Sequence, residues 1–176
     1  MSPRGPYVRI TVMTLHNSPL SRRALLLSVG AVAACTAARA GSDPFAASPW
    51  RKTTDAEWRR RLPAASYEVM RQEGTEAPFT SPLLNDHRNG MFACLGCGLP
   101  LFRSQWKFDS GTGWPSFYQE IHGALLRKAD YAIGVPRTEY HCAQCLGHHG
   151  HVFDDGPAPT GLRYCNNGAA LKFVPA

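Results

Sequence analysis

Two neighbouring segments read His148-His149-Gly150-His151-Val152-Phe153-Asp154-Asp155-Gly156 and Gly161-Leu162-Arg163-Tyr164-Cys165-Asn166-Asn167. The runs at 151–153 and 161–164 predict two short strands, since β-branched and aromatic residues favour strands and the Asp, Gly and Pro residues between the runs favour a turn. This arrangement brings three histidines close in sequence to one cysteine. Because a nearby imidazole can take the proton of a thiol, Cys165 is a candidate nucleophile.

The chain before residue 75 predicts two helices. Thr54 and Glu57 form a capping box, in which the threonine accepts from the backbone near Glu57 and the glutamate reaches back to the backbone of Thr54. We expect a first helix from there to about Leu62. A second helix should follow, which Pro63 opens and Gly74 ends.

After Gly74 the chain consists of short apolar runs separated by Gly, Pro, Asn and Asp, a pattern typical of strands joined by tight turns. Many short strands favour a small antiparallel β barrel or sandwich, so the predicted fold is mainly β with short N-terminal helices. Besides the two strands above, the expected strands are Gly90–Ala93, Leu101–Phe102, Ser116–Ile121, Ala124–Lys128, Ala132–Pro136, Thr138–His141 and Leu171–Val174.

Four other cysteines form two Cys-x-x-Cys knuckles, Cys94/Cys97 and Cys142/Cys145, which 44 residues separate. Glycines beside each pair suit the tight turn that points two sulfurs at one centre. Four thiolates around one centre are typical of structural zinc, so we expect one zinc ion per chain that clamps distant parts of the domain together. Two disulfides are the alternative, because the N-terminal segment predicts an oxidising compartment. A redox-active Cys-x-x-Cys is less favoured, because two matched pairs point to one shared site.

The first 40 residues predict an export signal. Arg22-Arg23 precedes an uncharged apolar run, Ala24–Ala38, that is too short to span a bilayer, and Ala38-Arg39-Ala40 offers a cleavage site. The arginine pair resembles a twin-arginine signal, although the residues after it match imperfectly. The alternatives are an uncleaved membrane anchor and lipidation at Cys35, whose surroundings resemble a lipobox.

We therefore divide the chain into a signal at 1–40, a linker at 41–53 rich in Ala, Ser and Pro, and one domain at 54–176. This division predicts export to the bacterial periplasm or cell envelope, with membrane contact only through the signal or a lipid anchor. The whole chain has 19 Lys and Arg against 13 Asp and Glu, but residues 41–176 have 14 against 13. A nucleic-acid module would keep a basic patch after processing, so nucleic acid is not an expected partner.

Five segments, in order along the chain, resemble the B-type methionine sulfoxide reductases over roughly residues 54–174. The resemblance implies reduction of methionine-R-sulfoxide in oxidised proteins or peptides, with Cys165 attacking the sulfur and becoming a sulfenic acid. The five segments are 74–80, the pair of cysteine knuckles at 94–97 and 142–145, which count here as one motif, 108–117, 150–157 and 163–167.

The resemblance also implies roles for other residues. His148 and His151 belong to the site and can supply the proton that the departing oxygen needs, since histidine titrates near neutral pH. Trp114 receives the substrate methyl group, which suits the favourable contact between sulfur and an aromatic ring. Asn167 helps to order the site. His149 falls where the family is usually apolar, so it is not included.

Two positions depart from the family pattern. Many members have a recycling cysteine where this chain has Thr112, so the sulfenic acid on Cys165 lacks that partner and a thioredoxin-like or small-thiol reductant should act on it directly. Gly168 stands where serine is common. Asp155 and Arg163 match family positions, where a structural role is as well supported as a catalytic one.

Other classes of function explain less of the chain. A non-catalytic zinc-ribbon binding module accounts for the knuckle cysteines, but not for Cys165, Trp114 and the histidines together. A cysteine hydrolase accounts for Cys165 with a histidine, but not for the five reductase-like segments. The reductase is therefore the function that we expect.

Overall fold

The structure is a computed structural model that describes residues 43–176. These residues belong to one compact unit, Ala40–Ala176. The expected export signal, including Cys35, lies outside the described residues. Among the residues that the structure describes, no helix has both the length and the apolar character needed to cross a bilayer.

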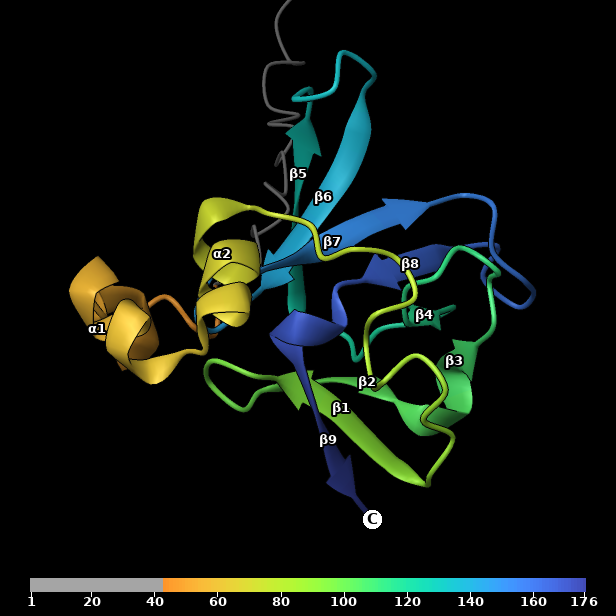
Figure 1. Ribbon diagram of the computed structural model, residues 1–176, viewed down its shortest axis with the longest axis horizontal. Coiled ribbons are helices and arrows are strands. Elements are labelled where there is room, and N and C mark those ends of the chain that lie inside the picture. Colours follow the sequence, from red (N-terminus) through yellow and green to blue (C-terminus); the bar gives the residue numbers. More distant parts are fainter. Residues whose placement is uncertain (1–42) are drawn as a thin grey trace, which may run out of the picture. The chain divides into compact units, whose positions relative to one another are not determined.

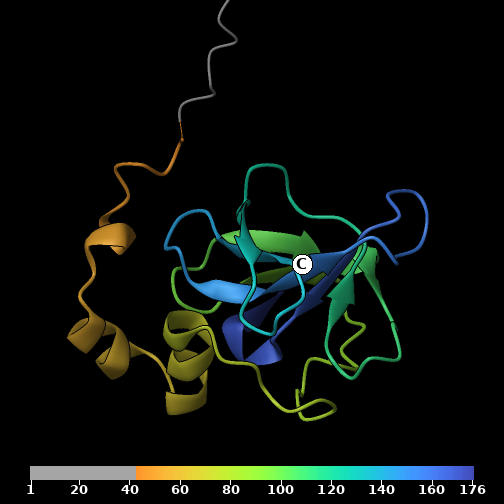
Figure 2. The same cartoon turned by 90° about the horizontal axis from the view of Figure 1, so that it is seen from above.

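Helices α1 (Asp55–Arg61) and α2 (Ala64–Gln72) confirm the two helices expected from the sequence. Thr54 caps α1 through the capping box. Its hydroxyl accepts from the backbone of Glu57, and the Glu57 carboxylate accepts from the backbone of Thr54 at 2.8 Å. Glu73 ends α2 in the left-handed conformation. Figure 2 shows both helices on one flank of the sheets.

A short 3-10 helix, η1 (Pro49–Lys52), lies in the stretch expected as a linker. The indole of Trp50 stacks on Trp58 of α1, with ring centroids 5.8 Å apart. Arg51 Nη2 donates to the carbonyl of Ala143 at 2.6 Å. These contacts join the 3-10 helix to the body of the domain.

Within the described residues nine strands form two antiparallel sheets, one with the order β2-β1-β9 and one with the order β3-β4-β8-β7-β6-β5 (Figure 1). This arrangement confirms the mainly β, antiparallel class; the strands form two sheets, not one closed barrel. The strands are β1 (Gly90–Cys94), β2 (Pro100–Arg103), β3 (Lys107–Phe108), β4 (Ser116–Phe117), β5 (Leu125–Asp130), β6 (Arg137–Cys142), β7 (His148–Phe153), β8 (Arg163–Asn166) and β9 (Leu171–Pro175), and the 3-10 helices η2 (Ser104–Trp106) and η3 (Gly168–Ala170) lie between them.

An aromatic core joins the two sheets. Phe92 of β1 and Phe102 of β2 contact Phe117 of β4, with ring centroids 5.0 and 4.3 Å apart. Phe102 also packs against Tyr140 of β6 and Tyr164 of β8. All five side chains are buried. Because burial of one large apolar side chain stabilises by roughly 1.5–3 kcal/mol, this cluster fixes β4 and β8 in place, and these strands support the site described below.

The expected strand Ala132–Pro136 is wrong. These residues form the turn between β5 and β6. The Asp130 carboxylate accepts from the backbone of Ala132 at 2.8 Å, and the backbone of Gly134 donates to the carbonyl of Tyr131 at 3.0 Å. Gly134 adopts a φ of 77°, which glycine tolerates and β-branched residues do not. The apolar residues of this segment therefore cross a hairpin tip instead of extending the sheet.

Candidate active site and metal centre

A pocket of about 130 Å³ opens over β7 and β8. Pockets that hold drug-sized ligands measure roughly 300–1,000 Å³, so this pocket suits a single side chain. It brings together four predicted site residues, namely Cys165, His151, Trp114 and Asn167. The full lining is Thr75, Trp114, Arg137, Gly150, His151, Phe153, Cys165, Asn166 and Asn167.

Strand register positions Cys165. On β8 it lies opposite His151 of β7 and opposite Ser116 of β4. Residues opposite each other on antiparallel strands share a face, so the imidazole and the thiol lie on the same side of the sheet. Gly150 permits this close approach, because a Cβ at that position would lie 2.0 Å from the carbonyl oxygen of Cys165.

The thiol of Cys165 lies in an environment that opposes ionisation. Burial raises its pKa above the ordinary value, while the guanidinium of Arg163 and the hydroxyl of Thr112 lower it. Asp155 fixes Arg163 with two hydrogen bonds of 2.8 Å each. Because burial outweighs these favourable groups, the thiol needs a base beside it before it can attack.

His151 is placed to be that base. Its Nε2 lies 2.8 Å from the Asp130 carboxylate, at the end of β5. The backbone N–H of Ala132 and the His151 ring hold the pKa of Asp130 well below its usual range. Asp130 therefore stays ionised, and its carboxylate orients the His151 ring through this hydrogen bond. Asp130 is not among the predicted site residues, because it falls between two expected strands, Ala124–Lys128 and Ala132–Pro136, and only the structure extends β5 to this residue.

His148 lies behind His151 and does not line the pocket. The two ring centroids are 5.6 Å apart. His148 is buried, and its Nδ1 hydrogen-bonds Glu139, a second carboxylate that the sequence analysis missed. Burial lowers the pKa of His148, and Glu139 opposes this effect. Within the described residues its Nε2 is buried and has no hydrogen-bond partner.

Trp114 and Asn167 are held by the same loop. The indole Nε1 of Trp114 donates to the carbonyl of Glu76 at 3.0 Å. Asn167 Oδ1 accepts from the backbone of Glu76 at 3.0 Å, and its Nδ2 donates to the carbonyl of His149 at 3.0 Å. The amide of Asn167 therefore ties the loop at residue 76 to β7, which is the geometry of a residue that orders the pocket wall.

The structure shows what surrounds Thr112 and Gly168, the two residues that depart from the family pattern. Thr112 lies beside the thiol, where its hydroxyl interacts with Cys165 and also lies 2.8 Å from that of Ser110. A Cβ on Gly168 would lie 1.8 Å from the hydroxyl oxygen of Ser81. Ser81 thus fills the space that a side chain at position 168 would need, which explains the glycine.

His149 is separate from the pocket. It is buried, and its Nδ1 lies 3.4 Å from Asn166 Oδ1. Burial lowers its pKa to about 3, so the ring is neutral at physiological pH. It therefore contributes no charge to the chemistry of Cys165.

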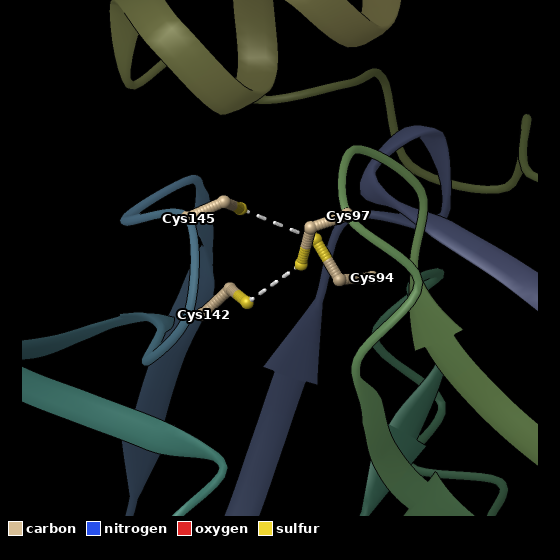
Figure 3. A group of neighbouring side chains, drawn as sticks. All are labelled: Cys94, Cys97, Cys142 and Cys145. Carbon is tan, nitrogen blue, oxygen red and sulfur yellow. Dashed lines mark hydrogen bonds between the residues drawn. The ribbon is translucent and has the colours of Figure 1, made fainter. Parts of the chain in front are cut away.

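The four knuckle cysteines converge on one centre (Figure 3). Sγ of Cys94 lies 3.5 Å from that of Cys145, and Sγ of Cys97 lies 3.4 Å from that of Cys142. Sulfurs in a disulfide are about 2.05 Å apart, so these cysteines are not paired in that way. Four sulfurs at the Zn–S distance of about 2.3 Å would form a tetrahedron with edges of about 3.8 Å. The four cysteines therefore suit a metal such as zinc.

The two knuckles share one turn geometry. The backbone of Gly98 donates to the carbonyl of Cys94, and that of Leu146 donates to the carbonyl of Cys142, both at 2.9 Å. Gly98 and Leu146 both adopt positive φ, 83° and 60°. Arg71 of α2 also donates to the carbonyl of Cys145 at 3.2 Å. The four-cysteine centre is thus built from two equivalent turns and supported by a helix.

The fold and the site define a small β domain with a half-buried thiol in a side-chain-sized pocket and a four-cysteine centre. Residues 62–175 match the family described as the SelR domain. The chain belongs to this family, which confirms the resemblance noted in the sequence. It is similar to the peptide methionine sulfoxide reductase MsrB of Thiobacillus denitrificans, with 51% identity over 123 residues, which cover 69% of this chain and 93% of the relative.

Two further relatives extend this comparison. The peptide methionine sulfoxide reductase MsrB of Agrobacterium fabrum is 48% identical over 129 residues, which cover 73% of this chain and 96% of the relative. The chloroplastic peptide methionine sulfoxide reductase B1 of Oryza sativa subsp. japonica is 54% identical over 120 residues, which cover 68% of this chain and 56% of the relative.

Proposed function

We propose that this chain is a peptide-methionine (R)-S-oxide reductase that returns methionine-R-sulfoxide in oxidised proteins or peptides to methionine. The observation that carries the proposal is the placement of Cys165 opposite His151, in a side-chain-sized pocket that Trp114 also lines. The chain is about half identical to peptide methionine sulfoxide reductases, and its pocket holds the thiol, the imidazole and the indole that the reaction needs.

The chemistry follows from these groups. His151 takes the proton of Cys165, and the thiolate attacks the sulfoxide sulfur, with the substrate methyl group against the indole of Trp114. A bond forms between Cys165 Sγ and the substrate sulfur, the imidazolium returns the proton to the oxygen, and the oxygen leaves as hydroxide. The hydroxide then adds to Cys165 Sγ, and the bond between the two sulfurs breaks and releases the thioether. In net terms one oxygen atom moves from the substrate to Cys165, the substrate becomes a thioether and the cysteine becomes a sulfenic acid. His148 packs behind His151 and supports that ring, which moves the proton.

An external thiol should complete the cycle. Thr112 stands where a recycling cysteine would lie, and the remaining cysteines in the described part of the chain are the four of the metal centre. Two thiols, from a thioredoxin-like protein or a small-thiol reductant, reduce the sulfenic acid to Cys165 thiol with release of water and formation of a disulfide. The sulfur spacing of the knuckles supports a structural role for the zinc, away from this cycle.

We also propose that the chain is exported from the cytoplasm. The arginine pair and the short apolar run in residues 1–40 support passage to the periplasm or cell envelope, with cleavage after Ala40. Mass spectrometry of the chain recovered from a bacterial periplasmic fraction should find a mature N-terminus at Gly41. A lipidated N-terminal Cys35 in the membrane fraction would instead support anchoring, and an intact N-terminus in the cytoplasm would contradict export.

One assay tests the function directly. The full-length protein is given the separated R and S epimers of a methionine sulfoxide peptide, with dithiothreitol as the reductant. We expect turnover of the R epimer alone. Turnover of the S epimer alone would contradict the assignment, and turnover of neither by the zinc-loaded protein would support the non-catalytic zinc-ribbon module.

A further inference from the structure

We propose that Glu139, His141 and His148 form a second cation site, separate from the four-cysteine centre, for a divalent metal such as Zn²⁺, Co²⁺ or Ni²⁺. One ligand atom from each of the three residues lies within 4.8 Å of the others. Glu139 Oε1 is 2.9 Å from His141 Nε2 and 2.5 Å from His148 Nδ1. Imidazole with a carboxylate is the ligand type that these cations accept.

The sheet arranges the three ligands in advance. His141 of β6 lies opposite His148 of β7, next to an irregularity in the register. Glu139 lies two residues before His141 on β6, and alternate residues of a strand share a face. All three ligands therefore come from paired strands, so no loop has to become ordered when a cation binds.

The hydrogen bonds of His141 prepare it as a ligand. Its Nδ1 lies 3.3 Å from the carbonyl of Leu146, which can only accept, so Nδ1 carries the proton. In the neutral ring Nε2 then presents a lone pair to the Glu139 oxygen. Nε2 is buried and has no hydrogen-bond partner among the described residues. A lone pair that faces a carboxylate oxygen 2.9 Å away needs a positive centre, either a proton on Nε2 or a metal cation, and a cation bound to both atoms satisfies both groups.

Burial and charge favour the same site. The side chains of Glu139, His141 and His148 are 3%, 14% and 1% exposed, so a bound cation is largely shielded from water. Lys128 is the competing positive group, with its Nζ 3.1 Å from the other oxygen of Glu139. Lys128 also pairs with Glu73 at 2.5 Å and is half exposed, so Oε1 of Glu139 remains available to the cation.

Occupation of this site should slow the reductase reaction, a consequence that rests on the proposed function. His148 packs behind His151, the proposed base, with ring centroids 5.6 Å apart. A cation bound at Nδ1 of His148 would place positive charge beside the His151 ring, which opposes the uptake of a proton from Cys165. The site thus makes the enzyme sensitive to free divalent metal.

The test is a titration of the full-length protein, with zinc in the four-cysteine centre, against Co²⁺. Calorimetry should find one additional ion, and the visible spectrum should lack the charge-transfer bands of cobalt bound to thiolates. The variant His141→Gln should bind that ion at least about tenfold more weakly, since even outer partners of a ligand change affinity by 10–100-fold. Lys128→Met should bind it more tightly, because a like charge is removed. His122→Gln, at an exposed histidine, is the matched control and should bind as the unmodified protein does.

Three outcomes would overturn the proposal: no additional ion, thiolate bands alone, or equal affinity in the protein and in His141→Gln. The consequence is measured separately, as a single turnover of the R-sulfoxide peptide without added thiol. Co²⁺ should slow that turnover in the unmodified protein and not in His141→Gln. Because binding is measured without substrate, a chain that lacks reductase activity would refute the proposed function and leave the cation site to be judged on the titration alone.

Discussion

At the residue level, the reactivity of Cys165 depends on a partner that moves its proton. Burial raises the pKa of the thiol, and His151 is the imidazole directly opposite on β7. The change His151→Ala should lower kcat/KM for the R epimer by about 10²–10⁴-fold, the usual contribution of a general acid or base. Circular dichroism and zinc content should not change. Equal rates in the variant and the unmodified protein would make His151 a structural residue.

A second residue-level prediction concerns His149, which the chemistry does not use. Burial lowers its pKa in the folded protein to about 3, whereas the unfolded chain has the ordinary value of about 6.5. Below pH 6.5 the unfolded chain therefore binds more protons than the folded one. The free energy of unfolding should fall as pH decreases, with a slope approaching about 1.4 kcal/mol per pH unit from this group.

The variant His149→Leu isolates this contribution. Urea unfolding between pH 7.5 and pH 5 should show a smaller loss of stability in the variant than in the unmodified protein. His148, whose pKa burial also lowers, contributes to the slope that remains. Parallel stability curves for the two proteins would contradict a neutral, buried His149.

At the level of elements, the close contact between β7 and β8 places the thiol. The change Gly150→Ala puts a methyl group 2.0 Å from the carbonyl oxygen of Cys165, so the strands must separate there. We expect a loss of stability of about 1–3 kcal/mol, as in overpacked cores, together with a loss of activity.

Gly123→Ala is the control, because its φ is also positive but nothing lies within 4 Å of the added methyl group. Gly123→Ala should destabilise by about 1–2 kcal/mol and leave activity unchanged. A Gly150→Ala enzyme with full activity would show that the two strands can separate at no cost to the site.

The predictions from the sequence succeeded where a local rule decides the structure. The capping box at Thr54 placed α1, and Pro63 directly precedes α2, although Glu73 and not Gly74 takes the left-handed conformation that ends α2. They failed where long-range pairing decides. The β-branched residues near Gly134 looked like a strand but form a hairpin tip, and β3, at Lys107–Phe108, is two residues long and has no pattern of its own.

The same division holds for the candidate site. Cys165, His151, Trp114 and Asn167 lie around one pocket, as the motifs implied. The carboxylates that orient the histidines, Asp130 and Glu139, lie on other strands, and their proximity depends on sheet register. A single sequence does not contain that register, so these partners became visible only in the folded chain.

At the level of the whole molecule, the four-cysteine centre joins the two sheets. Cys94 ends β1 of the smaller sheet, and Cys142 ends β6 of the larger one. Loss of one ligand in Cys94→Ser should release the zinc. Structural zinc contributes an apparent 10–16 kcal/mol in small domains, which is as large as the usual stability of a whole domain, so we expect the variant to unfold or to melt at a much lower temperature. Elemental analysis and thermal unfolding check this. A metal-free variant with an unchanged melting temperature would refute the clamp.

Recycling of the whole enzyme also depends on position 112, where this chain has a threonine and many family members have a recycling cysteine. Thr112 lies beside the thiol, so Thr112→Cys puts a second thiol next to Cys165. After a single turnover we expect this variant to hold a disulfide between positions 112 and 165, provided that their α-carbons lie within about 4.4–6.8 Å. Peptide mapping under non-reducing conditions checks this outcome. A persistent sulfenic acid in the variant would mean that position 112 is not a recycling position here.

The central claim is that Cys165 itself takes the oxygen and holds it until an external thiol arrives. Its most direct test is a single turnover of the unmodified protein with the R-sulfoxide peptide, without reductant, followed by a sulfenic-specific trapping reagent and mass spectrometry. We predict one reduced peptide per chain and one adduct, located on Cys165. A disulfide from Cys165 to another native cysteine, or a reduced peptide with Cys165 unmodified, would contradict the account.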